Sequence, residues 1–289
     1  MKLFLLLMLI KIVSAGISID LDVDNNNTVT ISYSGIAVNV ITDKDRELFK
    51  INDTTLKDAI ETYYGRRPKN IYLTSPTPWG DLYKKYSWEQ VSRVVSIKSA
   101  RVKGVAKNPV VVVSQDFENF SKRVIKVNTG LTHSVENTLT TTWSRSNQIT
   151  VSQEINYNVN VIFAKAEGTT SFSYSNSWGV SQERSKTVTL GTNTGMEAEL
   201  QPGQAVTTVL SAEAGYLEVE VIYKAYLQGD VAVNYKAAYN GHHFWAPPIK
   251  KLMKTGGLRN EVTTVENIKF GFHIDGSLKV YDKVTGTPL

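Results

Sequence analysis

The sequence predicts a mainly β, elongated protein with long antiparallel strands and a small mixed α+β head. From Val91 onward, Ser, Thr, Asn and Val alternate with single apolar residues almost to the C-terminus. This is the period-two pattern of strands, and helix signals are few there. The 289 residues are 42% hydrophobic and 20% charged, which supplies enough apolar surface for a core and excludes long disorder as the main state.

Residues 1–15 predict a signal peptide. Lys2 gives a positive start, residues 3–13 are apolar except for Lys11, and small residues precede an expected cleavage before Gly16. The uninterrupted apolar run is well short of the ~20 residues that a membrane-spanning helix needs. We therefore expect a secreted, extracellular protein, for which three sequons become candidate glycosylation sites, at Asn26, Asn52 and Asn119.

The composition excludes several classes of chemistry. There is no cysteine, which removes disulfides, thiolate metal sites and cysteine nucleophiles, and only four histidines are present. The net charge of +5 becomes +3 once Lys2 and Lys11 leave with the signal peptide. That bias is compatible with an anionic membrane but too weak to indicate nucleic acid. We expect no cofactor and no metal.

The N-terminal part combines short strands, one helix and an aromatic loop region. Residues 17–23 and 29–33 alternate like strands on either side of an Asn-rich turn. Residues 53–64 predict a helix with one apolar stripe. Asp53 or Thr54 is the expected N-cap, and Gly65 is expected to end the helix. Aromatic residues are frequent between residues 63 and 90. They would form either a contact surface for a receptor or sugar or the core of a small head. The candidates are Tyr63, Tyr64, Trp79, Tyr83, Tyr86 and Trp88.

Residues 149–163 carry the clearest alternation in the chain. Their odd positions are apolar in seven of eight cases and their even positions are polar in six of seven, so a strand here has one apolar and one polar face. A turn-like segment, 164–168, follows, and the pattern returns over 170–180. Strands usually have about 5–6 residues, whereas a membrane-crossing strand needs about 9–11. The sequence therefore predicts a long amphipathic hairpin at about residues 144–181.

Two interpretations of this hairpin remain open at the level of residues. Alternation of this length suits a transmembrane barrel to which several chains each contribute a hairpin. A soluble sandwich with unusually long strands would show the same alternation toward its core. In the first case the lipid-facing and tip residues are Ile149, Val151, Ile155, Tyr157, Val159, Val161, Ile162, Phe163, Phe172, Tyr174, Trp178 and Val180.

Signals for catalysis and metal binding are weak. His242 and His243 are adjacent, so a strand would point them to opposite faces, and packing near Phe244 and Trp245 is the expected role. Neither a Gly-x-Ser-x-Gly elbow nor a Gly-rich phosphate loop is present. We expect no enzyme. The basic clusters at 66–69 and 250–254 suit solvated faces, contacts with anionic lipid, or a protease-sensitive activation loop.

Several segments between about residues 100 and 245 occur in an order that resembles a known family. They are Asn-Phe-Ser-Lys at 119–122, the Ser/Thr-rich run at 133–143, the hairpin, Gln-Pro-Gly-Gln at 201–204, the alternating run at 217–227, and Gly-His-His-Phe-Trp at 241–245. Together they resemble the aerolysin-like β-pore-forming proteins, in the branch of clostridial epsilon toxin and the mosquitocidal toxins, with spherulin-type and insect follicular yolk-type relatives.

The resemblance implies a fold and a mode of action. It implies a soluble secreted monomer whose variable head, residues 16–100, docks on a membrane lipid, glycan or protein receptor. The long-stranded body, residues 101–289, would then form a homo-oligomer on activation and insert the hairpin, with residues 161–164 as its apolar tip. The spherulin and yolk-type relatives imply an alternative, a secreted structural or storage protein of eggshell or yolk type. A lectin-like binding module is a third possibility.

Overall fold

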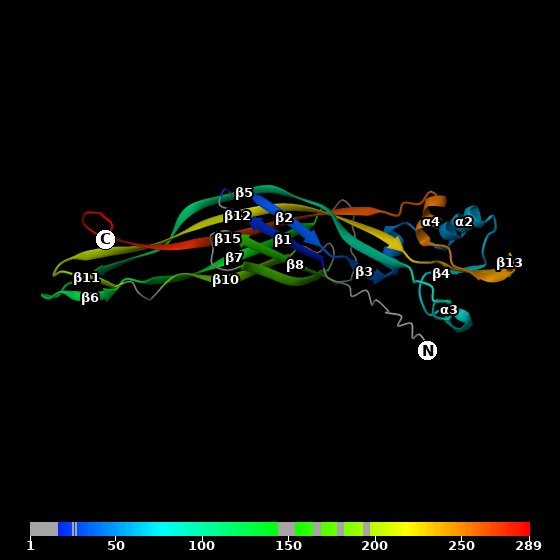
Figure 1. Cartoon of the computed structure of the whole chain (residues 1–289), viewed down its shortest axis with the longest axis horizontal. Helices are drawn as coiled ribbons and strands as arrows, with labels where there is room; N and C mark the ends of the chain where they lie inside the picture. Colours follow the sequence, from blue (N-terminus) through cyan, green and yellow to red (C-terminus); the bar gives the residue numbers. More distant parts are fainter. Residues whose placement is uncertain are drawn as a thin grey trace, which may run out of the picture.

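The computed structural model of the chain describes residues 17–24, 26, 28–143, 154–163, 169–177, 182–192 and 197–289. They form an elongated molecule of long strands with the helices gathered at one end, the head (Figure 1). At the opposite end lies a two-stranded sheet of β6 (Ile125–Asn128) and β11 (Glu197–Leu200). The prediction of a mainly β, elongated protein with long antiparallel strands and a small mixed head is confirmed.

A six-stranded antiparallel sheet organises the body. In its central strand, alternate residues from Leu217 to Leu227 are at most 1% exposed, whereas Glu218, Glu220 and Lys224 between them are partly exposed. Register shifts between the two longest strands mark bulges, which let strands of this length bend and twist. The strand order is β10 (Gln182–Thr192), β7 (Leu131–Trp143), β15 (Val262–Asp282), β12 (Ala205–Gln228), β5 (Ser92–Glu118) and β3 (Ala37–Val40).

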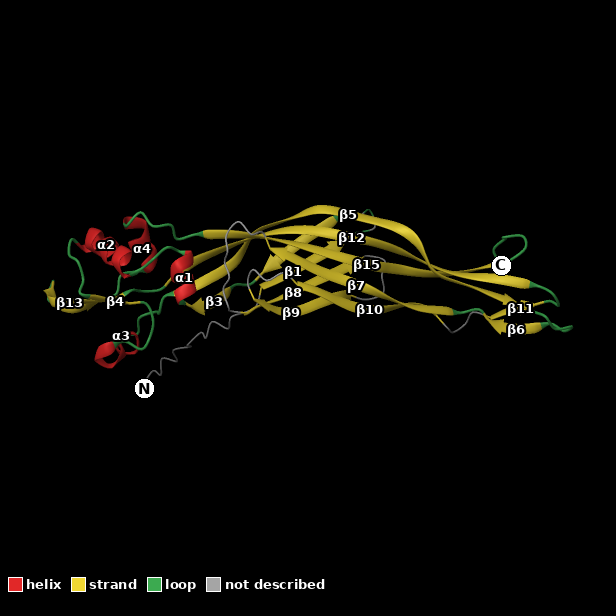
Figure 2. Cartoon of the chain, turned by 180° about the vertical axis from the view of Figure 1, so that it is seen from behind, coloured by secondary structure: helices red, strands yellow, loops and turns green. Residues whose placement is uncertain are grey.

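A second, four-stranded sheet crosses the middle of the body (Figure 2). Its order is β2 (Val29–Ser34), β1 (Ile17–Val23), β8 (Glu154–Phe163) and β9 (Thr169–Ser177). The apolar residues of β1 are at most 4% exposed. They share one core with residues of β7 and β15: Ile17, Ile19, Leu21, Val23, Leu139, Trp143 and Phe270. The core of the body therefore lies between the two sheets.

The head combines four helices with a three-stranded sheet. Its elements are α1 (Asp43–Leu48), α2 (Asp53–Tyr64), α3 (Pro78–Tyr86), α4 (Ile249–Thr255), β4 (Asn70–Tyr72), β13 (Ala232–Tyr239) and β14 (His242–Trp245). Helix α2 confirms the predicted helix, and Gly65 ends it with a φ of 75°. Its N-cap is Asn52, whose Oδ1 accepts from the Thr55 N–H at 2.9 Å, rather than Asp53 or Thr54.

Head and body are interleaved along the sequence. The expected division assigned residues 16–100 to the head and 101–289 to the body. In the structure, β1 and β2 belong to the sheet that contains β8, while β13 pairs with β4 and α4 packs on α2. Strand pairing joins segments that are distant in the sequence, and local composition does not reveal such partners. One cut at residue 100 therefore does not separate the two regions.

The aromatic segment from 66 to 90 is more regular than expected. It contains β4 and α3 where the sequence predicted a loop. Pro78 occupies the first turn of α3, where its missing N–H costs nothing. The residues that follow, Trp79, Gly80 and Asp81, have positive φ angles and interrupt the helix. Helix propensity did not predict this short helix, because its first turn is interrupted by a kink.

Candidate functional site

Strands β8 and β9 form an antiparallel hairpin in which the two alternating patterns are in phase. The register pairs Val159 with Phe172, and pairs Asn158 with Ser173. Directly opposite residues of an antiparallel pair lie on the same face of the sheet. Over residues 156–160, apolar positions therefore meet apolar ones and polar positions meet polar ones, whereas Ile155 and Val161 lie opposite Asn176 and Thr170. The described strands include eight of the expected insertion residues: Ile155, Tyr157, Val159, Val161, Ile162, Phe163, Phe172 and Tyr174.

Other parts of the expected hairpin lie outside the described residues. These are Ile149, Val151, Trp178 and Val180, together with the turn 164–168. The role of the hairpin residues in membrane insertion stays a prediction.

Strand β8 has a second neighbour that the sequence did not indicate. It pairs in parallel with β1 along the whole length of that strand, and the register joins Ile19 to Val159 and Leu21 to Val161. The polar positions of the two strands are matched in the same way, as in Ser18 with Asn158. The N-terminal strand therefore occupies the edge of the hairpin that β9 leaves open.

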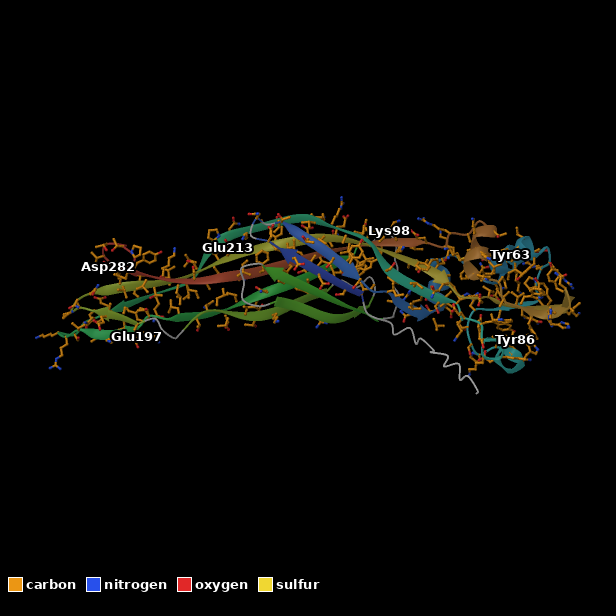
Figure 3. All side chains as sticks on the ribbon, viewed as in Figure 1. Tyr63, Tyr86, Lys98, Glu197, Glu213 and Asp282 are labelled. Atoms are coloured by element: carbon orange, nitrogen blue, oxygen red, sulfur yellow. The ribbon has the colours of Figure 1, made fainter. Side chains whose placement is uncertain are left out.

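One group of head aromatics packs between α2, β13 and β14. The ring of Tyr64 lies 5.9 Å from that of Tyr239 and 5.6 Å from that of Trp245. Burial raises the pKa of Tyr64 and raises the pKa of Tyr235 to about 12. Tyr63 packs edge-on against Tyr64 and is 38% exposed. Figure 3 shows Tyr63 and Tyr86 at the head end of the molecule.

A second aromatic group surrounds Trp79. This residue is 46% exposed, and its ring lies 5.1 Å from Phe244 and 6.1 Å from Tyr72. Its φ of 65° is in the left-handed region that bulky residues avoid. The Asp81 carboxylate braces the turn by accepting from the Ser75 hydroxyl, a bond that lowers the pKa of Asp81. Backbone strain that presents an exposed ring is typical of binding sites.

The structure corrects one member of the expected aromatic surface. Tyr83 is 3% exposed, and its hydroxyl lies within hydrogen-bonding distance of the carbonyl oxygens of Tyr72 and Asp230, at 2.8 and 2.9 Å. Burial raises its pKa. Tyr83 is therefore a core residue of the head, because α3 turns it away from solvent. Tyr86 is 43% exposed and stacks on the half-buried Trp88.

The structure also corrects the expectation that Asn119 is an accessible glycosylation site. It is fully buried, and its Nδ2, the atom to which a glycan would be joined, donates to the carbonyl oxygens of Arg123 and Leu200 at 2.7 and 2.8 Å. The sequon pattern reports residue types but not burial. Asn26 and Asn52 are exposed, so glycosylation there stays a prediction.

The histidine pair lies on β14 among aromatic residues. The His242 ring packs edge-on against Trp245, with centroids 5.8 Å apart, and the His243 Nδ1 lies 3.0 Å from the carbonyl oxygen of Tyr235. Within the described residues, no three His, Asp or Glu side chains gather as a metal site. None of the helices in those same residues is long and apolar enough to cross a bilayer.

Comparisons with known proteins identify relatives that are named as toxins. No family model matches it. It is 38% identical over 251 residues to U-megalopygitoxin(8)-Mo12 of Megalopyge opercularis, covering 87% of this chain and 86% of that protein. It has the same identity and coverage with U-megalopygitoxin(8)-Mc8 of Megalopyge crispata.

Among solved structures, the chain superposes on the parasporin-2 toxin of Bacillus thuringiensis with a TM-score of 0.57 at 16% identity. The match covers 85% of this chain and 97% of that one. This likeness supports the aerolysin-like fold, although not the epsilon-toxin and mosquitocidal branch that the sequence suggested. The extended identity to the two Megalopyge proteins is more specific, and the chain belongs to the U-megalopygitoxin(8) family.

Proposed function

We propose that the chain is a secreted pore-forming protein that assembles on a membrane and inserts the β8–β9 hairpin. The observation that carries this proposal is the register of the hairpin, in which apolar and polar pairs alternate over residues 156–160. Alternation is what a barrel strand between lipid and a water-filled lumen requires. Strand β8 has 10 residues, and a membrane-crossing strand needs about 9–11. Membership of a family whose members are named toxins supports the same proposal.

Insertion by this route requires an oligomer. Within lipid every backbone N–H and C=O must be paired inside the protein, so only a closed barrel can cross with strands. One hairpin supplies two strands, so several chains have to contribute one hairpin each. The expected signal peptide, residues 1–15, lies outside the described residues and would deliver the protein to the exterior.

Permeabilisation of liposomes by protein starting at Gly16 tests the proposal. Calcein release is measured before and after limited trypsin treatment, and each sample is run on a gel that retains SDS-resistant oligomers. Release together with a high-mass band is the expected result. If folded protein gives neither calcein release nor a high-mass band, pore formation is overturned and the structural or storage role is favoured.

Val159→Asp is expected to abolish calcein release. A charge on the lipid face of a barrel at the bilayer midplane costs about 2–4 kcal/mol for Arg or Lys and less for Asp, and this cost recurs in every subunit. Asn160→Asp is the matched control, because it adds the same carboxylate one residue away, on the polar side of the alternation. It should keep most of the release. Circular dichroism establishes that both variants are folded, and equal release from both would show that the assigned faces are wrong.

We also propose that exposed aromatics of the head contact a glycan or protein receptor. Tyr63, Trp79 and Tyr86 are the candidates, because each exposes more than a third of its surface. Aromatic rings give much contact area for little loss of conformational entropy and dominate many binding surfaces. The strained backbone that presents Trp79 makes this residue the first to test.

Trp79→Ala is expected to lower binding to susceptible cells or arrayed glycans at least tenfold, because truncation of a central aromatic contact commonly costs about 2 kcal/mol or more. Release of dye from receptor-free liposomes should be unchanged. Tyr216→Ala is the control, since Tyr216 is 40% exposed but lies on β12 in the body. Equal binding by the two variants would contradict the assignment.

A further inference from the structure

A cleft of about 500 Å³ opens where α4 lies against β12. Lys250 and Lys254 come from α4, one turn apart, so both lie on the same face of the helix. Lys224 and Tyr226 come from β12, two residues apart, so both point to the outer face of the sheet. A strand and a helix thus contribute three lysines to the lining of one cleft.

On the outer face of the body sheet, several charged side chains form ion pairs across neighbouring strands. Arg101 Nε donates to Glu220 Oε1 at 2.7 Å, and Lys103 Nζ lies 3.3 Å from Glu218 Oε1. The residues opposite Lys224 are instead Ser96 and Thr263, which are neutral. Lys224 therefore breaks the pattern of cross-strand ion pairs, at the position that lines the cleft.

Among the described residues, none of the three lysines of the cleft forms an ion pair with a carboxylate. Glu261 is the acidic residue of the lining, and its Oε1 is 3.1 Å from Nζ of Lys98. Figure 3 shows Lys98 at the boundary between head and body. Like charges gathered in a concave space repel one another and raise the local concentration of anions. The positive potential of the three lysines therefore favours binding of a multiply charged anion in the cleft.

The remaining lining is suited to a ring-shaped ligand. Tyr226 and Leu258 are half-buried and contribute apolar surface. The Asn260 amide is held by two hydrogen bonds of 2.9 Å with the backbone of Leu227, which keeps this wall in place. The volume lies within the ~300–1,000 Å³ typical of small-ligand sites. An aromatic ring beside several ammonium groups is an arrangement that holds a sugar ring and its acidic substituents.

We infer that this cleft binds an anionic saccharide that carries sulfate or phosphate ester groups. The lysines would pair with the ester oxyanions while Tyr226 packs against the sugar ring. Such chemistry occurs in sulfated polysaccharides and in the phosphorylated sugar headgroups of lipids. The site uses none of the residues of the hairpin or of the surface around Trp79, and it stands whether or not the chain forms pores.

Two probes distinguish the sources, with protein starting at Gly16. One is a heparin-derived hexasaccharide, compared with its desulfated counterpart. The other is phosphatidylcholine vesicles containing phosphatidylinositol 4,5-bisphosphate, compared with phosphatidylcholine alone. Binding is measured by calorimetry or by co-sedimentation, so the readout does not depend on permeabilisation. Saturable binding to the hexasaccharide assigns the site to a polysaccharide, and binding to the vesicles alone assigns it to a lipid headgroup.

The triple variant Lys224→Gln, Lys250→Gln and Lys254→Gln is expected to lose at least tenfold in affinity for the probe that binds. Its control, Lys44→Gln with Lys122→Gln and Lys186→Gln, removes the same charge from exposed lysines outside the cleft and should lose less than threefold. Wild-type affinity should fall as salt rises. Equal losses in the two variants, or no binding of wild type to either probe, would overturn the inference.

Discussion

A disulfide between β1 and β8 is expected to abolish membrane permeabilisation, and its reduction is expected to restore it. Ser18 and Asn158 are Cα partners in the parallel pairing. Neighbouring strands lie about 4.7–4.9 Å apart, within the ~4.4–6.8 Å Cα separation that a disulfide spans. Ser18→Cys with Asn158→Cys adds this pair to a chain that has no other cysteine. The proposed insertion carries β8 into the bilayer, and β8 cannot leave β1 while the two are covalently joined.

The measurement is the rate of calcein release with and without dithiothreitol. Oxidised protein should release dye at the background rate and form no SDS-resistant oligomer, and the reduced protein should approach wild type. Asn70→Cys with Asn234→Cys is the matched control, because it joins paired strands within the head. Its oxidised form should permeabilise normally. Undiminished release by the oxidised β1–β8 variant would show that the hairpin does not have to separate from β1.

Local periodicity was sufficient to predict strands β1, β8 and β9, but not the pairing of β1 with β8. The alternation of residues 17–23 and 154–163 is visible in the sequence, because a strand places successive side chains on opposite faces. The antiparallel pairing of β8 with β9 was expected because only five residues of the sequence separate the two strands. Nothing local indicates that β1 lies parallel to β8, since these strands are separated by more than a hundred residues. Such pairing is decided by the packing of the whole core.

Burial was the other property that residue types did not reveal. Tyr83 and Tyr86 are three positions apart in one aromatic segment, yet the first is 3% exposed and the second 43%. Asn119 satisfies the sequon pattern and is nonetheless fully buried. The lysine spacing in α4 is visible in the sequence, whereas the approach of Lys224 from β12 is a tertiary feature. Candidate binding residues therefore needed the structure to separate surface from core.

Arg93→Met is expected to lower the free energy of unfolding by about 3–5 kcal/mol, because it leaves a buried carboxylate without its cation. Arg93 Nη1 lies 2.6 Å from Oδ1 of Asp45, and their side chains are 1% and 0% exposed. The pair joins α1 of the head to β5 of the body sheet. Denaturant unfolding, or the shift of the thermal midpoint, measures the loss. Arg46→Met is the control, since Arg46 lies the same 2.6 Å from Asp53 in an exposed pair, whose loss costs about 1 kcal/mol or less.

The double variant Asp45→Leu with Arg93→Met separates the cost of the unpaired charge from the value of the pair. Removing both charges leaves no buried ion to desolvate, and such replacements are often neutral or stabilising. Asp45 also accepts from the Thr42 N–H at 2.9 Å and the Thr42 hydroxyl at 2.8 Å, which caps α1. That cap is worth about 1 kcal/mol, so recovery should be substantial but incomplete. If the double variant is as unstable as Arg93→Met, the lost free energy of unfolding comes from packing rather than from the unpaired Asp45 carboxylate.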